Sequence, residues 1–112
     1  MERIWIVPAT VVRVVDGDTV KLALDLGWHV TYTANCRIVG INAPEIGTPP
    51  GVRAKQHAET LLAPGDAVTF ASHTLDKYGR PLGNLYHGVD PMRDFGEDMI
   101  ESGHAIPYGP PS

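Results

Sequence analysis

Cysteine is almost absent from this chain. Cys36 is the only one among 112 residues, which excludes an internal disulfide and a cluster of metal-bound thiolates. We expect Cys36 to be a small buried side chain in a strand, where free cysteine behaves as an apolar residue.

Long apolar runs are also missing. The apolar stretch near the N-terminus is too short for a signal peptide and is interrupted by Pro8. No other stretch approaches the length that spans a membrane. We therefore expect a protein with no membrane partner that is cytoplasmic or otherwise intracellular, or secreted if a leader peptide had been removed.

Basic residues are outnumbered by acidic ones. The chain has 9 Lys and Arg against 13 Asp and Glu, a net charge of -4 and a pI of about 5.6. This balance argues against a protein that grips nucleic acid mainly by neutralising phosphates. It is compatible with an acidic pocket that binds a divalent cation first and a phosphate second.

The length and composition indicate a single domain. A chain of 112 residues supports one hydrophobic core, so we expect one monomeric domain over residues 1–112, with loose ends at about 1–7 and 107–112. The 12 glycines and 10 prolines favour short elements joined by many turns.

Sequence periodicity predicts a mainly β fold with two helices. β-branched residues and two-residue alternation indicate strands, and apolar residues three and four positions apart indicate helices. The predicted strands are 9–15, 19–24, 29–41, 67–70 and 81–86, and the predicted helices are 52–62 and 95–101. Three strands, a main helix and two strands form the order of a five-stranded OB-fold barrel, an α+β architecture.

Two carboxylates lie in the Asp-Gly-Asp-Thr segment at 16–19, between two predicted strands. Aspartate and glycine favour tight turns, so an ordinary turn explains the segment. Alternatively, one carboxylate points into a cleft and binds a hard cation such as calcium through oxygen. The segment alone leaves both interpretations open.

Two arginines and a glutamate are harder to explain as surface residues. Arg37 lies inside an apolar strand, where a guanidinium is costly unless it reaches a partner or solvent. Glu45 enters a loop rich in glycine and proline, and loops often carry function. Arg80 ends the turn Asp-Lys-Tyr-Gly-Arg at 76–80, which fits a solvated turn but offers a second guanidinium that matches a phosphate.

In this order and spacing, the three segments resemble the staphylococcal-nuclease-like (thermonuclease) family. The resemblance covers about residues 9–108 and rests on Val-Asp-Gly-Asp-Thr-Val at 15–20, Arg-Ile-Val-Gly-Ile-Asn-Ala-Pro-Glu at 37–45 and the turn at 76–80. It implies an OB-fold nuclease that depends on Ca2+ and hydrolyses phosphodiester bonds of DNA or RNA. Its products would carry a 3′-phosphate and a 5′-hydroxyl.

The resemblance also implies a calcium site. Asp18 would be a direct carboxylate ligand, and the Asn42 side chain and the Ala43 carbonyl would be two further ligands. Asp16 would act indirectly, through water or by holding the turn. The family usually has aspartate where this chain has Asn42, and calcium affinity depends on ligand charge, so we predict weaker calcium binding than a typical member shows.

The remaining roles implied by the resemblance concern substrate and catalysis. Arg37 and Arg80 would hold the scissile phosphate, and Glu45 would orient or deprotonate the attacking water. Lys77 and Tyr78 would lie beside the terminal phosphate of the nucleotide. A metal and two arginines would stabilise the charge that develops on the phosphate oxygens.

Alternatives to a nuclease belong to other classes. A catalytically inactive OB-fold module that binds nucleic acid or protein would share the fold, and a calcium-binding structural protein would leave both arginines unused. Retention of Asp18, Arg37, Glu45 and Arg80 together favours the nuclease. Tyr108 is the best aromatic candidate for stacking on a base.

Overall fold

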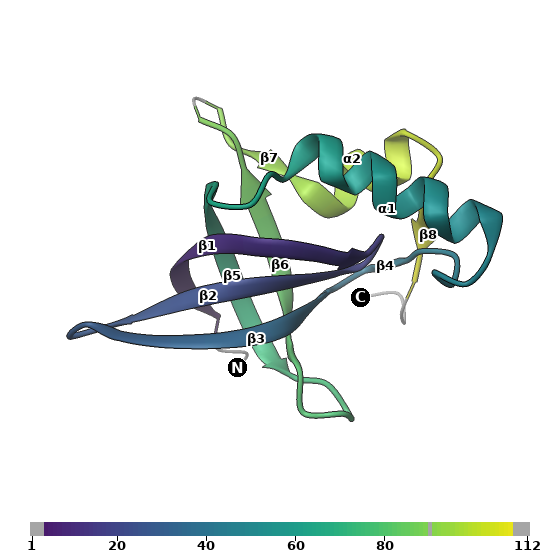
Figure 1. Ribbon diagram of the computed structural model, residues 1–112. Coiled ribbons are helices and arrows are strands. Elements are labelled where there is room, and N and C mark those ends of the chain that lie inside the picture. The colour runs from purple at the N-terminus through teal and green to yellow at the C-terminus, as the bar shows by residue number, and fades with distance from the viewer. Residues whose placement is uncertain (1–3, 90, 109–112) are drawn as a thin grey trace.

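The chain folds into a closed β-barrel with two helices packed against it (Figure 1). The computed structural model describes residues 4–89 and 91–108. The strands are β1 (Trp5–Asp16), β2 (Thr19–Gly27), β3 (Val30–Ile38), β4 (Ile41–Asn42), β5 (Ala67–Leu75), β6 (Pro81–His87), β7 (Arg93–Asp94) and β8 (Ile106–Pro107), and the helices are α1 (Pro49–Leu61) and α2 (Phe95–Glu101). The α+β class and the five-stranded OB-fold barrel expected from the sequence are confirmed.

One parallel pairing closes the barrel. The strand order β3-β2-β1-β5-β6 is antiparallel throughout, and β3 then pairs with β6, Arg37 opposite Leu82 and Ile38 opposite Gly83. Because successive side chains of a strand point to opposite faces, alternate residues fill the interior, as Leu22 does in β2 with no exposed surface. The closure places Arg37 at the seam between the two ends of the sheet.

Helix α1 begins at Pro49, three residues before the predicted start. Thr48 caps the helix by accepting a hydrogen bond from the Gly51 N–H, and prolines are tolerated in the first turn because those N–H groups have no partner within the helix. Small residues bring α1 close to the turn between β1 and β2: a Cβ added at Gly17 would lie 3.0 Å from the Cβ of Ala54. The Asp-Gly-Asp-Thr turn is therefore packed beneath the helix.

Parts of the segments predicted to be loose pair with the rest of the fold. Strand β1 begins at Trp5 and pairs with β5, so pairing reaches into the segment predicted to be loose, and Val7 is buried. At the other end, Pro107 pairs with Ile41, and the Tyr108 N–H donates to the Gly40 carbonyl at 2.9 Å. Residues 1–3 and 109–112 of the predicted loose ends lie outside the described residues.

The predicted strand 29–41 is divided in two. β3 ends at Ile38 and β4 begins at Ile41, because Gly40 turns the chain with a φ of +82°, a conformation that favours glycine. The short strands β7 and β8 are additions to the predicted pattern. Within the described residues, no helix is both long and apolar enough to cross a membrane.

A buried carboxylate attaches α2 to the barrel. An oxygen of Asp98 lies 2.7 Å from Nε2 of His87 on β6, and its other oxygen accepts a hydrogen bond of 2.6 Å from Nη2 of Arg93. The hydrogen bond from Arg93, together with that from His87, lowers the pKa of Asp98 despite its burial. The role of this cluster is structural, because it holds α2 against β6 and β7.

Candidate active site

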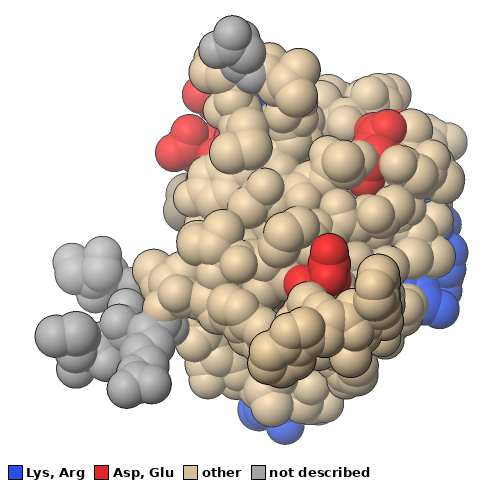
Figure 2. Space-filling model, turned by 90° about the vertical axis from the view of Figure 1, so that its left-hand side faces the viewer, with Lys and Arg blue, Asp and Glu red and all other residues tan. Residues whose placement is uncertain are grey.

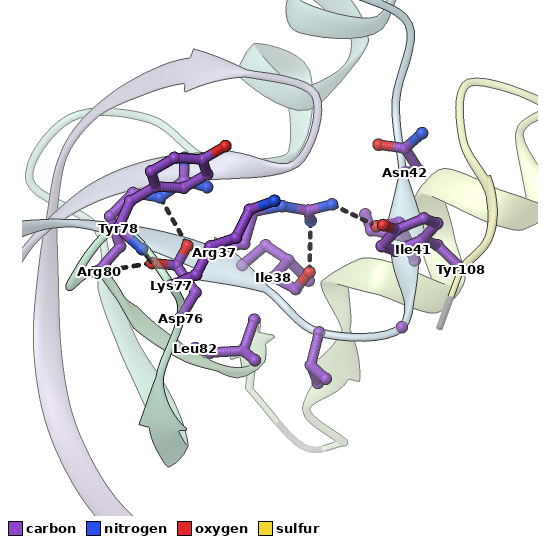
Figure 3. Close-up of a pocket in the computed structure, with 12 residues that line it drawn as sticks. Arg37, Ile38, Ile41, Asn42, Asp76, Lys77, Tyr78, Arg80, Leu82 and Tyr108 are labelled. Carbon is purple, nitrogen blue, oxygen red and sulfur yellow. Dashed lines mark hydrogen bonds and ion pairs between the residues drawn. The ribbon is translucent and has the colours of Figure 1, made fainter. Parts of the chain in front are cut away.

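A cavity of about 350 Å³ opens between the β3–β4 segment and the β5–β6 turn (Figure 3). Six residues singled out from the sequence line it together, although they come from segments far apart in the chain. These six are Arg37, Asn42, Lys77, Tyr78, Arg80 and Tyr108. Three cations and two phenol rings thus face one space of a size typical for small-ligand sites.

Asp76 organises the turn that carries Arg80. Its Oδ1 accepts hydrogen bonds of 2.9 Å from the N–H groups of Tyr78 and Arg80, and its Oδ2 accepts one of 2.7 Å from Nε of Arg80. Although burial opposes the shift, the hydrogen bonds from Arg80 and Tyr78 lower the pKa of Asp76. The Arg80 guanidinium is therefore held through Nε, and its two outer nitrogens are not used in this contact.

Tyr78 forms the outer wall of the cavity, between two cations. Nζ of Lys77 lies 5.2 Å and the guanidinium carbon of Arg80 lies 5.5 Å from the centre of its ring. Both distances are within the range of cation–π attraction. Tyr78 as a whole residue is 72% exposed, so it is accessible to a ligand.

Arg37 is held by the backbone around it. Its Nη1 donates to the Ile38 carbonyl at 2.6 Å, and its Nη2 donates to the Ile41 carbonyl at 2.8 Å. Figure 3 shows the guanidinium directed toward these two residues. Nη2 also lies 3.5 Å from Oδ2 of Asp18. The arginine thus connects β3, β4 and the Asp-Gly-Asp-Thr turn, which explains its tolerance inside an apolar strand.

Asp18 is buried next to the cavity. Its Oδ2 accepts a hydrogen bond of 2.9 Å from the Ala43 N–H, and its Oδ1 accepts one of 3.2 Å from the Thr19 hydroxyl. Asp16 supports the turn, because its Oδ1 accepts the Asp18 N–H at 3.1 Å. Burial, reinforced by the neighbouring Asp18 carboxyl, raises the pKa of Asp16 to about 6.

The candidate calcium ligands, at Asp18 and in the segment 42–43, are all oxygens. Besides the Asp18 carboxylate, the Asn42 amide and the Ala43 carbonyl belong to the adjacent segment, and hard cations such as calcium prefer such ligands. No group of three or more His, Cys, Asp or Glu residues able to hold a metal occurs among the described residues. Both Asp18 oxygens already accept hydrogen bonds. The oxygen chemistry of these residues fits a calcium ion.

Glu45 lies outside the cavity. It is exposed on the segment before α1, and within the described part of the chain it is not among the residues that line the space. Its backbone is fixed, because its carbonyl accepts hydrogen bonds from the N–H and the hydroxyl of Thr48. The structure thus brings together the arginines and aromatic residues of the predicted site but not Glu45.

Sequence reasoning assigned no role to Asp76 or to the carbonyls of Ile38 and Ile41. The only signal for Asp76 was its position at the start of the turn 76–80, since aspartate accepts hydrogen bonds from backbone groups two residues on. The carbonyls carry no sequence signal, because every residue has one.

Fold and cavity together define an OB-fold barrel with a cationic pocket beside a buried carboxylate. The sequence profile described as staphylococcal nuclease homologue matches residues 35–110. The chain is also 32% identical over 109 residues to "Endonuclease YhcR" of Bacillus subtilis (strain 168), covering 86% of this chain and 8% of that protein. It is 31% identical over 104 residues to "Micrococcal nuclease" of Shigella flexneri, covering 88% of this chain and 56% of that protein.

The chain belongs to the staphylococcal nuclease family, because the profile matches more than half of it. An "Uncharacterized endonuclease" of Escherichia coli O157:H7 is 34% identical over 98 residues, which are 88% of this chain and 59% of that protein. The chain spans little more than half the length of these shorter relatives and a small part of the Bacillus protein.

Proposed function

We propose that this chain is a calcium-dependent nuclease that hydrolyses phosphodiester bonds of DNA or RNA. The observation that carries the proposal is the meeting of Arg37, Lys77 and Arg80 around one cavity in a chain whose net charge is -4. A local excess of positive charge of this kind fits a phosphate ligand. Membership of the family and the nuclease names of the similar proteins support the same function.

Arg80 is the residue best prepared to bind the scissile phosphate. Asp76 holds its Nε, and the remaining nitrogens match two phosphate oxygens in a bidentate pair. Hydrolysis places additional negative charge on these oxygens, and a guanidinium already in position stabilises that charge without reorganisation. Asp76 therefore supports the reaction by orienting Arg80.

Arg37 contributes positive charge from a fixed position, because the Ile38 and Ile41 carbonyls hold its guanidinium. Calcium, held by Asp18 and by the Asn42 and Ala43 oxygens, would add positive charge for the phosphate oxygens when bound. Asp18 also lies 3.5 Å from Arg37 and so couples the arginine to the calcium site.

Glu45 orients or deprotonates the attacking water in this proposal. A carboxylate serves as a base only within hydrogen-bonding reach of its water, so the water must lie on the side of the bound phosphate that faces the segment carrying Glu45, which the Glu45 carbonyl anchors to Thr48. The rings of Tyr78 and Tyr108 face the cavity from opposite sides (Figure 3). Tyr108 stacks on a base of the substrate, while Lys77 and Tyr78 lie beside the terminal phosphate.

The test is cleavage of a fluorescent single-stranded DNA, with calcium and with chelator. We expect calcium-dependent cleavage, with kcat about 10²- to 10³-fold lower in Arg80→Ala, as for the loss of one transition-state donor. Arg37→Ala and Glu45→Gln should also lose most of the activity. Arg53→Ala is the matched control, because Arg53 is exposed on α1 outside the cavity lining, and its activity should match the parent.

One observation favours a second function, a binding module without catalysis. Both outer nitrogens of Arg37 are engaged by backbone carbonyls, and Glu45 does not line the cavity among the described residues. If the parent protein retards single-stranded DNA in a gel but does not cleave it at millimolar calcium, the binding module replaces the nuclease.

A further inference from the structure

Two basic side chains lie opposite each other outside the cavity, on neighbouring strands. Arg13 of β1 pairs with Lys21 of β2, and Lys21 pairs with Asn35 of β3. Val14 and Leu22, their neighbours in sequence, are buried in the barrel. Since strand residues alternate between faces, the side chains of Arg13, Lys21 and Asn35 lie on the outer face of the barrel.

A like-charged pair at this position works against folding. Like charges directly opposite each other on neighbouring strands are destabilising, and among residues 4–89 and 91–108 neither Arg13 nor Lys21 forms an ion pair. The nearest acidic residue on the same face of β2, Asp25, accepts a hydrogen bond from the Gly27 N–H toward the hairpin tip. An external anion would relieve the repulsion that the fold leaves in place.

This pair is continuous with the candidate active site. Arg37 follows Asn35 by two residues on β3, so both project from the same face. Strand geometry separates the Cα atoms by about 7 Å along β3 and about 5 Å across to β2, which places the Cα of Lys21 about 9 Å from that of Arg37. Arg13 lies one strand further. We call Arg13, Lys21, Asn35 and Arg37 the basic band.

The distribution of charge over the molecule sets the basic band apart. Figure 2 shows one side of the molecule, on which most of the surface is uncharged, Asp and Glu lie within the view and Lys and Arg appear mainly at the margins. Of the 9 Lys and Arg residues in the chain, five belong to the basic band or to the cavity lining. These five are Arg13, Lys21, Arg37, Lys77 and Arg80.

We propose that the basic band binds the sugar-phosphate backbone of single-stranded DNA on one side of the phosphate held in the cavity. The inference rests on the proposed function and extends it, since it fixes the course of the strand across β3, β2 and β1. A cavity of about 350 Å³ admits a single nucleotide rather than a duplex. Asn35 between the cations offers an amide that bonds to phosphate or sugar oxygens.

The test compares binding of a fluorescein-labelled 12-nucleotide DNA and a labelled trinucleotide, measured by anisotropy with calcium in a Glu45→Gln background. Arg13→Gln combined with Lys21→Gln should weaken binding of the longer strand about tenfold and affect the trinucleotide much less. Each phosphate contact on a single strand contributes about 0.7 to the slope of log K against log salt. The slope should therefore fall by about 1.4.

Two controls make the outcome specific. The first control, Arg53→Gln with Lys55→Gln, removes the same charge from α1 and should leave the affinity for both DNA lengths unchanged. The second control, Arg13→Lys with Lys21→Arg, keeps both charges and should bind DNA like the parent. Unchanged affinity in the band variant, an equal loss in the α1 control, or an equal loss for both strand lengths would overturn the basic band. A wild-type protein that binds DNA without cutting it would refute the nuclease and leave the basic band standing.

Discussion

For the substitution Gly51→Ala, two physical effects predict opposite changes in the free energy of unfolding. Gly51 lies in the first turn of α1, where alanine instead of glycine stabilises an unconstrained helix by about 1 kcal/mol. In this structure a Cβ at Gly51 would overlap the carbonyl oxygen of Glu45 and lie 2.9 Å from the Cα of Ile46. Because both obstacles are backbone atoms, no side-chain rotation relieves the overlap.

The loss of stability in Gly51→Ala can be estimated from the displacement of the Glu45 carbonyl. Inserting a methyl group into a packed site costs about 1–3 kcal/mol. Displacing the Glu45 carbonyl also weakens its hydrogen bonds from the N–H and hydroxyl of Thr48, at 3.0 and 2.6 Å, each contributing about 1 kcal/mol. After subtracting the gain in helix propensity, Gly51→Ala should lower the free energy of unfolding by about 2 kcal/mol.

Urea unfolding followed by circular dichroism measures this change. Gly47→Ala is the matched control, because nothing lies within 4 Å of a Cβ added there, and its stability should change by less than about 1 kcal/mol, toward higher stability. A Gly51→Ala variant that gains stability would show that the contact with Glu45 is not rigid. In that case the argument for a fixed Glu45 backbone also fails.

Three further predictions concern charge. Asn42→Asp should tighten calcium binding, because a charged oxygen replaces a neutral one; a calorimetric titration showing equal affinity contradicts this. The pKa of Asp98 is lowered in the fold by Arg93 and His87, so the stability it confers is present above its unfolded pKa of about 3.9 and is lost as pH falls through the folded value. Urea midpoints between pH 7 and 3 should therefore fall less in Asp98→Asn than in the parent. Burial raises the pKa of Cys36 to about 12, so a thiol reagent at pH 8 should label the unfolded chain but not the native one.

Much of the barrel follows from local sequence patterns. The predicted helix 95–101 is confirmed as Phe95–Glu101, because Asp94 caps its start and Gly103, with a φ of +81°, follows its end. The strands β7 and β8 were missed and β4 was not separated from β3, since each of the three has two residues and so carries no periodicity. Their pairing depends on partners that only the closed fold brings near.

The candidate site, like the barrel, was predicted only in part. The resemblance to the staphylococcal-nuclease-like family identified Lys77, Tyr78 and Arg80, which one turn holds together beside the cavity. It did not predict that backbone carbonyls hold Arg37 or that the Glu45 side chain lies outside the cavity lining among the described residues. Both depend on how β4 and the start of α1 pack against the barrel, which short motifs do not encode.

The parallel pairing of β3 with β6 has a consequence for how the chain acquires its site. Arg37 and Leu82 line the cavity and are also opposite each other at the seam, so the cavity exists only once β6 has joined β3. Contacts between segments so distant in sequence form slowly, and a nascent chain that has not yet extended through β6 has no pocket. A ligand that binds only the closed barrel pulls the folding equilibrium toward it.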